Sequence, residues 1–106
     1  MNGLTLAYLG DAYYELSIRS YLIQKGWADV QILHQKAIKF TSGKAQATIL
    51  DYLMEASILQ ADEISVFKRG RNASGPGRKN IDAQTYHKAT GFEALLGYLS
   101  LDHPIR

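Results

Sequence analysis

Two segments of the sequence each place a single carboxylate among apolar and small residues at helical spacing. In LAYLGDAYYEL, residues 6–16, Asp11 directly follows a glycine. In ATGFEALLGYL, residues 89–99, Glu93 has alanine, threonine and glycine one turn away on either side. Asp is a poor helix-interior residue, and carboxylates are seldom buried without a partner. The small residues allow another helix to pack close by, so the pattern predicts that these two helices meet with their carboxylates facing one another.

Helical signals dominate the rest of the chain, and no segment shows the sustained period-two alternation of a strand. The pattern predicts an all-α fold of about five helices in one catalytic domain, residues 1–106. KRGRNASGPGRKN, residues 68–80, is too rich in Gly, Pro and Ser to be helical and is predicted to be a loop. The predicted helices run over residues 4 to about 24, from an N-cap at Asp29, through Ala47 to Met54, from Asp62, and from an N-cap at Asp82 to about Leu101.

The composition excludes several classes of site. The chain has no cysteine, which rules out disulfides, thiolate metal sites and a cysteine nucleophile. This is compatible with a reducing cytosol, and we expect a cytoplasmic location. No apolar run approaches the ~20 residues needed to span a membrane, so no membrane partner is expected.

The basic residues are unevenly distributed. Residues 68–79 hold five of the 12 basic residues and no acid, whereas the net charge of the whole chain is only +2. Such a positive segment on a slightly acidic body indicates a polyanionic partner, whose phosphates its cations would neutralise. The alternative is a surface loop that is basic for solubility. The basic residues are Lys68, Arg69, Arg71, Arg78 and Lys79.

The two carboxylates also have a plain alternative, because each can be an exposed polar position on an amphipathic helix. If their helices pack together, the like charges repel unless a cation lies between them. Carboxylate oxygens suit Mg²⁺, which commonly takes one or two protein carboxylates together with waters and substrate phosphate. The pattern thus favours a magnesium site without showing that the helices meet.

Both motifs resemble segments of a known family. LTLAYLGDA, residues 4–12, resembles the signature helix of ribonuclease III enzymes, and GFEALLGYL, residues 91–99, resembles their second catalytic segment. With the basic segment, they are most similar to the Mini-III branch, which lacks a separate double-stranded-RNA-binding domain. The resemblance implies a homodimeric, Mg²⁺-dependent endoribonuclease. It would cleave double-stranded RNA and mature the precursor of the large-subunit (23S) ribosomal RNA.

The resemblance also implies roles for individual residues. Asp11 matches the signature aspartate and Glu93 the second glutamate, and both are expected to be catalytic and to hold Mg²⁺. The larger enzymes carry a glutamate at the position of Ala7 and an aspartate at that of Thr90. Water, substrate phosphate, the Thr90 hydroxyl or Glu15 remain open as further ligands. The five basic residues are expected to hold the RNA backbone.

Two competing functions come from the same residues. A non-catalytic helical RNA-binding module would keep the basic segment and lose activity with Ala7 and Thr90. An interaction domain would instead use the aromatic first helix, where Tyr8, Tyr13 and Tyr14 offer a face for self-association or for another protein.

Overall fold

The chain folds into helices joined by short connections. The computed structural model describes residues 2–75 and 82–102, and within this part it contains no strand, so the all-α prediction is confirmed. None of the described helices is long and apolar enough to cross a membrane. The helices are α1 (Gly3–Gln24), α2 (Val30–Thr41), α3 (Gly43–Glu55), α4 (Ala61–Ala73) and α5 (Ala83–Asp102).

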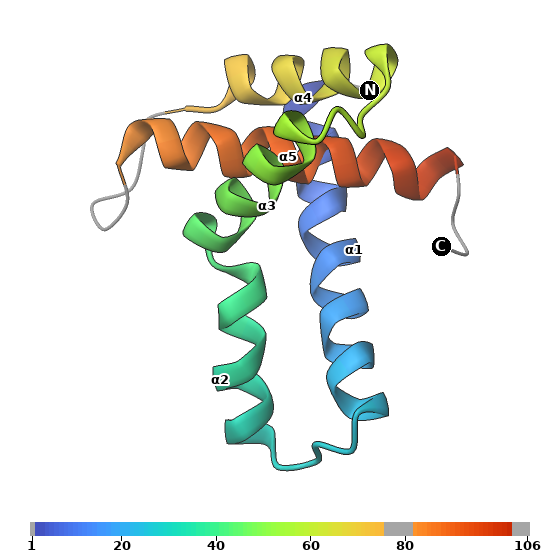
Figure 1. Cartoon of the computed structure of the whole chain (residues 1–106), viewed down its shortest axis with the longest axis vertical. Helices are drawn as coiled ribbons and strands as arrows, with labels where there is room; N and C mark the ends of the chain where they lie inside the picture. Colours follow the sequence, from blue (N-terminus) through green and yellow to red (C-terminus); the bar gives the residue numbers. More distant parts are fainter. Residues whose placement is uncertain (1, 76–81, 103–106) are drawn as a thin grey trace.

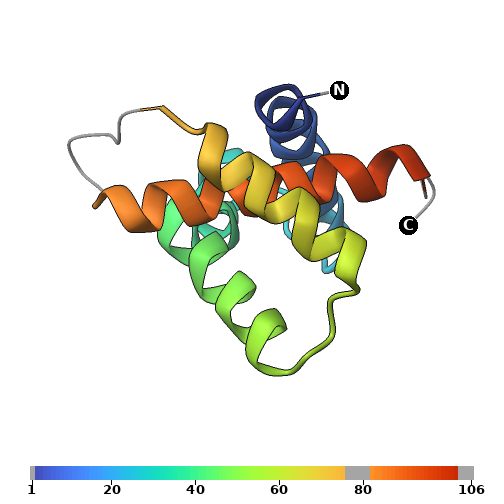
Figure 2. The same ribbon diagram turned by 90° about the horizontal axis from the view of Figure 1, so that it is seen from above.

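Helix α5 is the centre of the arrangement. It runs across the molecule and packs against α1, α3 and α4 (Figure 1). Seen from above, α4 crosses α5 obliquely, and the N-terminal end of α1 lies beside both helices (Figure 2). The C-terminal half of α1 leaves this layer and pairs with α2, and the two helices project from the body as a hairpin (Figure 1).

Side-chain caps begin two of the helices where the sequence predicts them. The Asp29 carboxylate accepts hydrogen bonds from the first backbone amides of α2, at 3.0 and 3.1 Å. The Asp82 carboxylate accepts from the Thr85 amide at 2.9 Å and from its hydroxyl at 2.8 Å. These two bonds hold the pKa of the Asp82 carboxyl below its usual range. Both predicted N-caps are therefore confirmed.

The start of α4 differs from its prediction. The helix begins at Ala61 rather than Asp62, with Gln60 as its N-cap. The Glu63 carboxylate accepts a hydrogen bond from the Gln60 backbone amide at 2.8 Å. This is the reciprocal half of a capping box, in which the residue three positions into the helix satisfies the cap residue.

The predicted loop over residues 68–80 is wrong in its first part, because α4 continues through it to Ala73. Packing against α5 overrides the low helix propensity of glycine. A Cβ on Gly70 would lie only 2.5 Å from the Cβ of Ala94, so this glycine allows the two helices to approach closely. The neighbouring Phe67 is also buried, with 4% of its surface exposed. Residues 76–81 lie outside the described part of the chain.

Among the described residues, two clusters of buried side chains stand out in the core, and both include residues of α5. Together they fix α1, α3 and α4 on the central helix. The first cluster contains Leu6, Ala7, Val66 and Ala94, and the second contains Leu50, Phe67 and Phe92.

Candidate active site at a helix crossing

Helices α1 and α5 cross with their backbones in contact, and one glycine from each makes this possible. A Cβ on Gly10 would lie 1.7 Å from the carbonyl oxygen of Glu93. A Cβ on Gly97 would lie 2.0 Å from the carbonyl oxygen of Leu6. No side chain fits at either position, so the predicted close packing of the two helices is confirmed.

The two candidate carboxylates lie at this crossing. Asp11 directly follows Gly10 on α1 and is exposed, while the backbone of Glu93 on α5 faces Gly10. The Glu93 side chain is partly buried. The structure thus brings together the two segments that the sequence singles out. Their joint role in catalysis stays a prediction.

The amide of Gln46 contacts Glu93. Its Nε2 donates a hydrogen bond to Oε2 of Glu93 at 3.3 Å, from the first turns of α3. Only 2% of Gln46 is exposed. The sequence analysis missed this residue. The only signal in the sequence is that this polar residue stands next to Ala47 and one turn before Leu50. Both of these apolar residues are buried in the structure.

The positions where larger relatives carry further acids are buried in this chain. Ala7 is 6% exposed and belongs to the core cluster with Val66 and Ala94. Thr90 is 8% exposed, and its hydroxyl donates to the carbonyl oxygen of Tyr86 at 3.1 Å. Both positions therefore serve packing in this fold.

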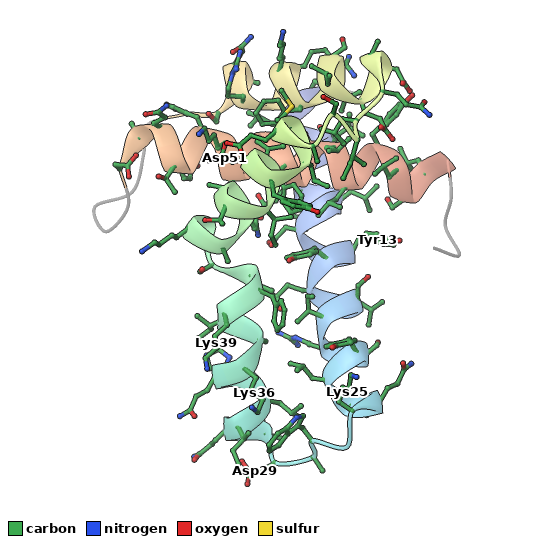
Figure 3. All side chains as sticks on the ribbon, in the orientation of Figure 1. Tyr13, Lys25, Asp29, Lys36, Lys39 and Asp51 are labelled. Atoms are coloured by element: carbon green, nitrogen blue, oxygen red, sulfur yellow. The ribbon has the colours of Figure 1, made fainter. Side chains whose placement is uncertain are left out.

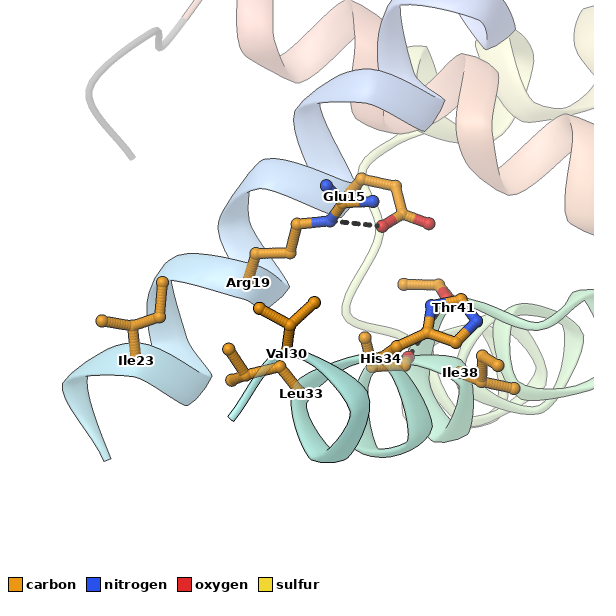
Figure 4. Close-up of a pocket in the computed structure, with 9 residues that line it drawn as sticks. Glu15, Arg19, Ile23, Val30, Leu33, His34, Ile38 and Thr41 are labelled. Atoms are coloured by element: carbon orange, nitrogen blue, oxygen red, sulfur yellow. Dashed lines mark hydrogen bonds and ion pairs between the residues drawn. The ribbon is translucent and has the colours of Figure 1, made fainter. Parts of the chain in front are cut away.

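Glu15, another open choice for a metal ligand, is engaged on the hairpin. Its carboxylate accepts from Nε of Arg19 at 3.2 Å, beside a cavity of about 260 Å³ between α1 and α2 (Figure 4). His34 and Thr41 line the same cavity from α2. Within residues 2–75 and 82–102, no three acidic or histidine side chains are grouped so that they could hold a metal ion.

The predicted RNA-binding residues lie at the C-terminal end of α4 as far as the structure describes them. Lys68 and Arg69 are exposed. Arg71 is partly buried, and its guanidinium carbon lies 5.5 Å from the centre of the Phe67 ring. A Cβ on Gly3 would lie 2.9 Å from the carbonyl oxygen of Arg69. The basic turn of α4, residues 68–71, therefore contacts the start of α1. Arg78 and Lys79 lie outside the described residues.

The hairpin carries a second group of basic residues that the sequence analysis did not single out. Lys25, Lys36 and Lys39 lie along it, away from the crossing (Figure 3). The ammonium group of Lys36 lies 4.0 Å from the centre of the Trp27 ring, and that of Lys25 lies 5.4 Å from the Tyr21 ring. Two of these lysines are thus held against aromatic side chains at the far end of the molecule.

Comparison with known families agrees with this geometry. The family model described as the ribonuclease III domain matches residues 4–104. The matched range contains α1, α5 and their crossing. The chain therefore belongs to the ribonuclease III family, and it is an endoribonuclease.

Individual relatives place the chain within that family. It is 54% identical over 101 residues to the Mini-ribonuclease 3 of Acholeplasma laidlawii, and the matched region covers 95% of this chain and 81% of that relative. It is 47% identical over 102 residues to the Mini-ribonuclease 3 of Enterococcus faecalis, covering 95% and 77%. The crystal structure of a Fusobacterium nucleatum protein superimposes with a TM-score of 0.87 at 30% identity, covering 98% of this chain and 83% of that one. The resemblance to Mini-III ribonucleases is thus confirmed.

Proposed function

We propose that Asp11 and Glu93 form the catalytic centre of an endoribonuclease that hydrolyses double-stranded RNA with Mg²⁺. One observation carries this proposal: the backbone of Glu93 lies against Gly10, the residue next to Asp11. Two residues with carboxylate side chains, from helices far apart in sequence, are thereby brought to one crossing. The family supports the reaction class, because the chain matches the ribonuclease III domain over residues 4–104.

The donor set fits Mg²⁺. This ion commonly takes one or two protein carboxylates and keeps waters and substrate phosphate as its other ligands. Asp11 and Glu93 would hold it, without a third acid. When bound, the ion supplies positive charge that stabilises the phosphate in the transition state and lowers the pKa of a bound water.

The chain's own residues supply rigidity and access. Asp11 is exposed, so its carboxylate is open to a large substrate. It follows a glycine that is locked against α5, which limits movement of the Asp11 backbone relative to Glu93. Gln46, from α3, donates a hydrogen bond to one carboxylate oxygen of Glu93.

The basic turn of α4 would bind the RNA backbone, together with Arg78 and Lys79. Double-stranded RNA is recognised largely by shape and by phosphate and 2′-hydroxyl contacts. Lys68 and Arg69 are exposed near the start of α1 and can meet phosphates directly. Stacking on Phe67 pre-orients the guanidinium of Arg71.

A second copy of the chain would cover an exposed apolar stripe on α1. These residues are four, eight and seven positions apart, close to whole turns of the helix, and so lie on one side of it, with Tyr8 85% exposed. We therefore propose a homodimer, which would present one catalytic centre to each RNA strand. The stripe consists of Leu4, Tyr8, Leu16 and Ile23.

The resemblance to Mini-III ribonucleases supports a finer assignment. The substrate would be the precursor of the large-subunit (23S) ribosomal RNA, processed in the cytoplasm. Residues 1–106 would act as one catalytic domain. Incubation with that precursor, followed by mapping of the cut ends, tests the assignment against other structured RNAs.

The cleavage mechanism is tested with long double-stranded RNA and Mg²⁺, with and without EDTA. Asp11→Asn and Glu93→Gln should each lower the cleavage rate by more than about 100-fold while RNA binding persists. Glu55→Gln, an exposed carboxylate at the end of α3, should cleave like the wild type. Cleavage that survives EDTA would contradict the metal role, and RNA binding without any cleavage would favour the non-catalytic module.

The RNA surface is tested by the salt dependence of binding. Neutralising three basic residues should weaken binding and lower the slope of log K against log salt by about 2 to 3. A second triple variant that removes the same charge from the hairpin is the matched control. An unchanged slope in the first variant, or equal losses in both, would remove the basic segment from the interface. The two variants change Arg69, Arg71 and Arg78 to Gln, and Lys25, Lys36 and Lys39 to Gln.

The dimer is tested by light scattering. Tyr8→Glu places a charge in the centre of the exposed stripe on α1 and should yield monomers. Ser20→Glu changes an exposed residue on the hairpin part of the same helix and should leave the mass unchanged. A wild-type protein that scatters as a monomer at all concentrations would contradict the proposal.

A further inference from the structure

Gln46 lies where three helices meet. Its Nε2 donates to the carbonyl oxygen of Thr41, at the end of α2, at 3.1 Å. The same nitrogen donates to Oε2 of Glu93 on α5 at 3.3 Å. With 2% of its surface exposed, Gln46 is more deeply buried than Thr90 at 8%. One buried amide thus hydrogen-bonds both to the candidate catalytic carboxylate and to the turn between α2 and α3.

The orientation of this amide is fixed by its neighbours. Both the Thr41 carbonyl and the Glu93 carboxylate are acceptors, so the NH₂ group must face them. Turning the amide over would place its oxygen against two other oxygens. In the observed orientation Oε1 of Gln46 is buried and has no hydrogen-bond partner.

Keeping the amide in this place is costly. A buried carbonyl without a partner keeps the cost of its lost hydration, and native proteins contain few such groups. A methionine would fill nearly the same volume without this cost. What the amide adds is a donor aimed at Glu93.

A neutral donor suits a carboxylate that has to bind a cation. A lysine or arginine at position 46 would offset the charge of Glu93 and compete with a metal ion for it. An acid there would repel Glu93. The amide holds one carboxylate oxygen and leaves the negative charge in place.

The corner that carries Gln46 is itself fixed. The Ser42 hydroxyl caps α3 by accepting from the Ala45 amide at 3.2 Å. The Tyr14 hydroxyl of α1 donates to the carbonyl oxygen of Phe40 at 3.0 Å, one residue before Thr41. These two hydrogen bonds hold the turn between α2 and α3 from which Gln46 reaches Glu93.

We propose that Gln46 is a positioning residue of the catalytic centre, which orients the Glu93 carboxylate to bind the divalent cation. The inference rests on the proposed roles of Asp11 and Glu93. Ala7 and Thr90, where larger relatives carry acids, are buried in packing here, and Gln46 of α3 donates to the Glu93 carboxylate.

The test compares Gln46→Met with the wild type, using Mn²⁺ as a spectroscopic probe in place of Mg²⁺. Binding of Mn²⁺ to the RNA-free protein, followed by electron paramagnetic resonance, should weaken about 10- to 100-fold. The kcat for cleavage should fall, with KM for RNA unchanged. Thr48→Ala changes an exposed residue of the same helix, whose hydroxyl donates to the Lys44 carbonyl oxygen within α3, and serves as the control with unchanged Mn²⁺ affinity.

A measurement on the wild-type protein does not depend on how the variant folds. In NMR spectra, the side-chain NH₂ signals of Gln46 should shift on addition of Mg²⁺, and they should not shift in Asp11→Asn. Wild-type Mn²⁺ affinity and kcat in Gln46→Met, or unmoved NH₂ signals, would overturn the positioning role and leave the catalytic carboxylates standing. Equal Mn²⁺ affinity of the wild type and a double variant, Asp11→Asn with Glu93→Gln, would overturn the metal site itself.

Discussion

The two halves of α1 are built in different ways. The first half packs against α4 and α5, and four of its residues are buried, namely Gly3, Leu6, Ala7 and Gly10. The second half packs against α2, and Leu22 is its only buried residue. The first half is fixed by backbone contact with α5, whereas the second is held through side-chain contacts with α2 such as the Tyr21–Phe40 pair.

This difference separates two tasks within one helix. The clamped half carries Asp11, whose proposed role needs a fixed distance to another helix. The hairpin half needs only to hold α2, which it does with an aromatic pair between the two helices and a short turn that ends in the cap of α2. Substitutions should therefore cost much more stability near the crossing than on the hairpin.

The largest effect is expected at the crossing. Gly10→Ala would place a Cβ 1.7 Å from a backbone oxygen of α5, which cannot give way as a side chain can. We expect a loss of at least about 3 kcal/mol in the free energy of unfolding, at the upper end for overpacking. Urea unfolding measures it, with Ser20→Ala on the hairpin half as a control near zero. A loss below about 1 kcal/mol in the free energy of unfolding would mean that α1 and α5 can move apart with little loss of stability.

Substitution of Gly26, which lies just after the C-terminal end of α1, should lower the free energy of unfolding by less and for another reason. Gly26 has a φ of +102°, which L side chains rarely adopt, but a Cβ there would meet no atom within 4 Å. Gly26→Ala should therefore lower stability by about 1–2 kcal/mol, through backbone strain alone. A loss as large as that of Gly10→Ala, measured in the same urea series, would break the contrast between the two halves.

Tyr14 lies at the boundary between the halves and should show a pH-dependent effect. Burial raises the pKa of its phenol above the usual 10.0. The neutral form is therefore favoured by folding, and its stabilisation is complete below pH 10 and lost as the pH rises through the higher folded-state pKa. Tyr14→Phe should cost about 1 kcal/mol at neutral pH, from the bond to the Phe40 carbonyl, and should flatten the alkaline fall in thermal stability. An equal fall in both proteins would argue against this assignment.

The smallest effect is expected at the Arg19–Glu15 pair on the hairpin. The side chain of Arg19 is 67% exposed, and the two residues are four positions apart on one helix. Arg19→Ala should cost no more than about 0.5 kcal/mol, and the cost should shrink in 0.5 M salt. A loss above about 1.5 kcal/mol would show that the cavity beside this pair supports the hairpin more than its exposure indicates.

The helices and the crossing could be predicted because their signals are local. Asp29 and Asp82 cap helices by contacts within one turn, and the small residues around Asp11 and Glu93 predict close packing whatever the partner. The end of α4 could not be predicted in this way. In the sequence, Gly70 near the end of α4 indicates a helix break. Only its close approach to Ala94 in the structure shows that it is a packing residue.

The candidate site was predictable only in part, for a similar reason. A lone glutamine in an apolar helix has no spacing that assigns it to Glu93, 47 positions later in the chain. The burial of Ala7 likewise depends on Val66 and Ala94, which come from two other helices. Partners so distant in sequence appear only when the helices are assembled.

The backbone contact between Gly10 and α5 also bears on how activity is lost on heating. Since no side chain separates the two helices here, the spacing between the backbones that carry Asp11 and Glu93, the proposed catalytic residues, cannot loosen gradually through changes of side-chain rotamer. Cleavage competence should then persist until the crossing itself opens, and the hairpin can fray beforehand without inactivating the centre. Thermal inactivation and exposure of the α1–α5 core would therefore coincide as a single transition.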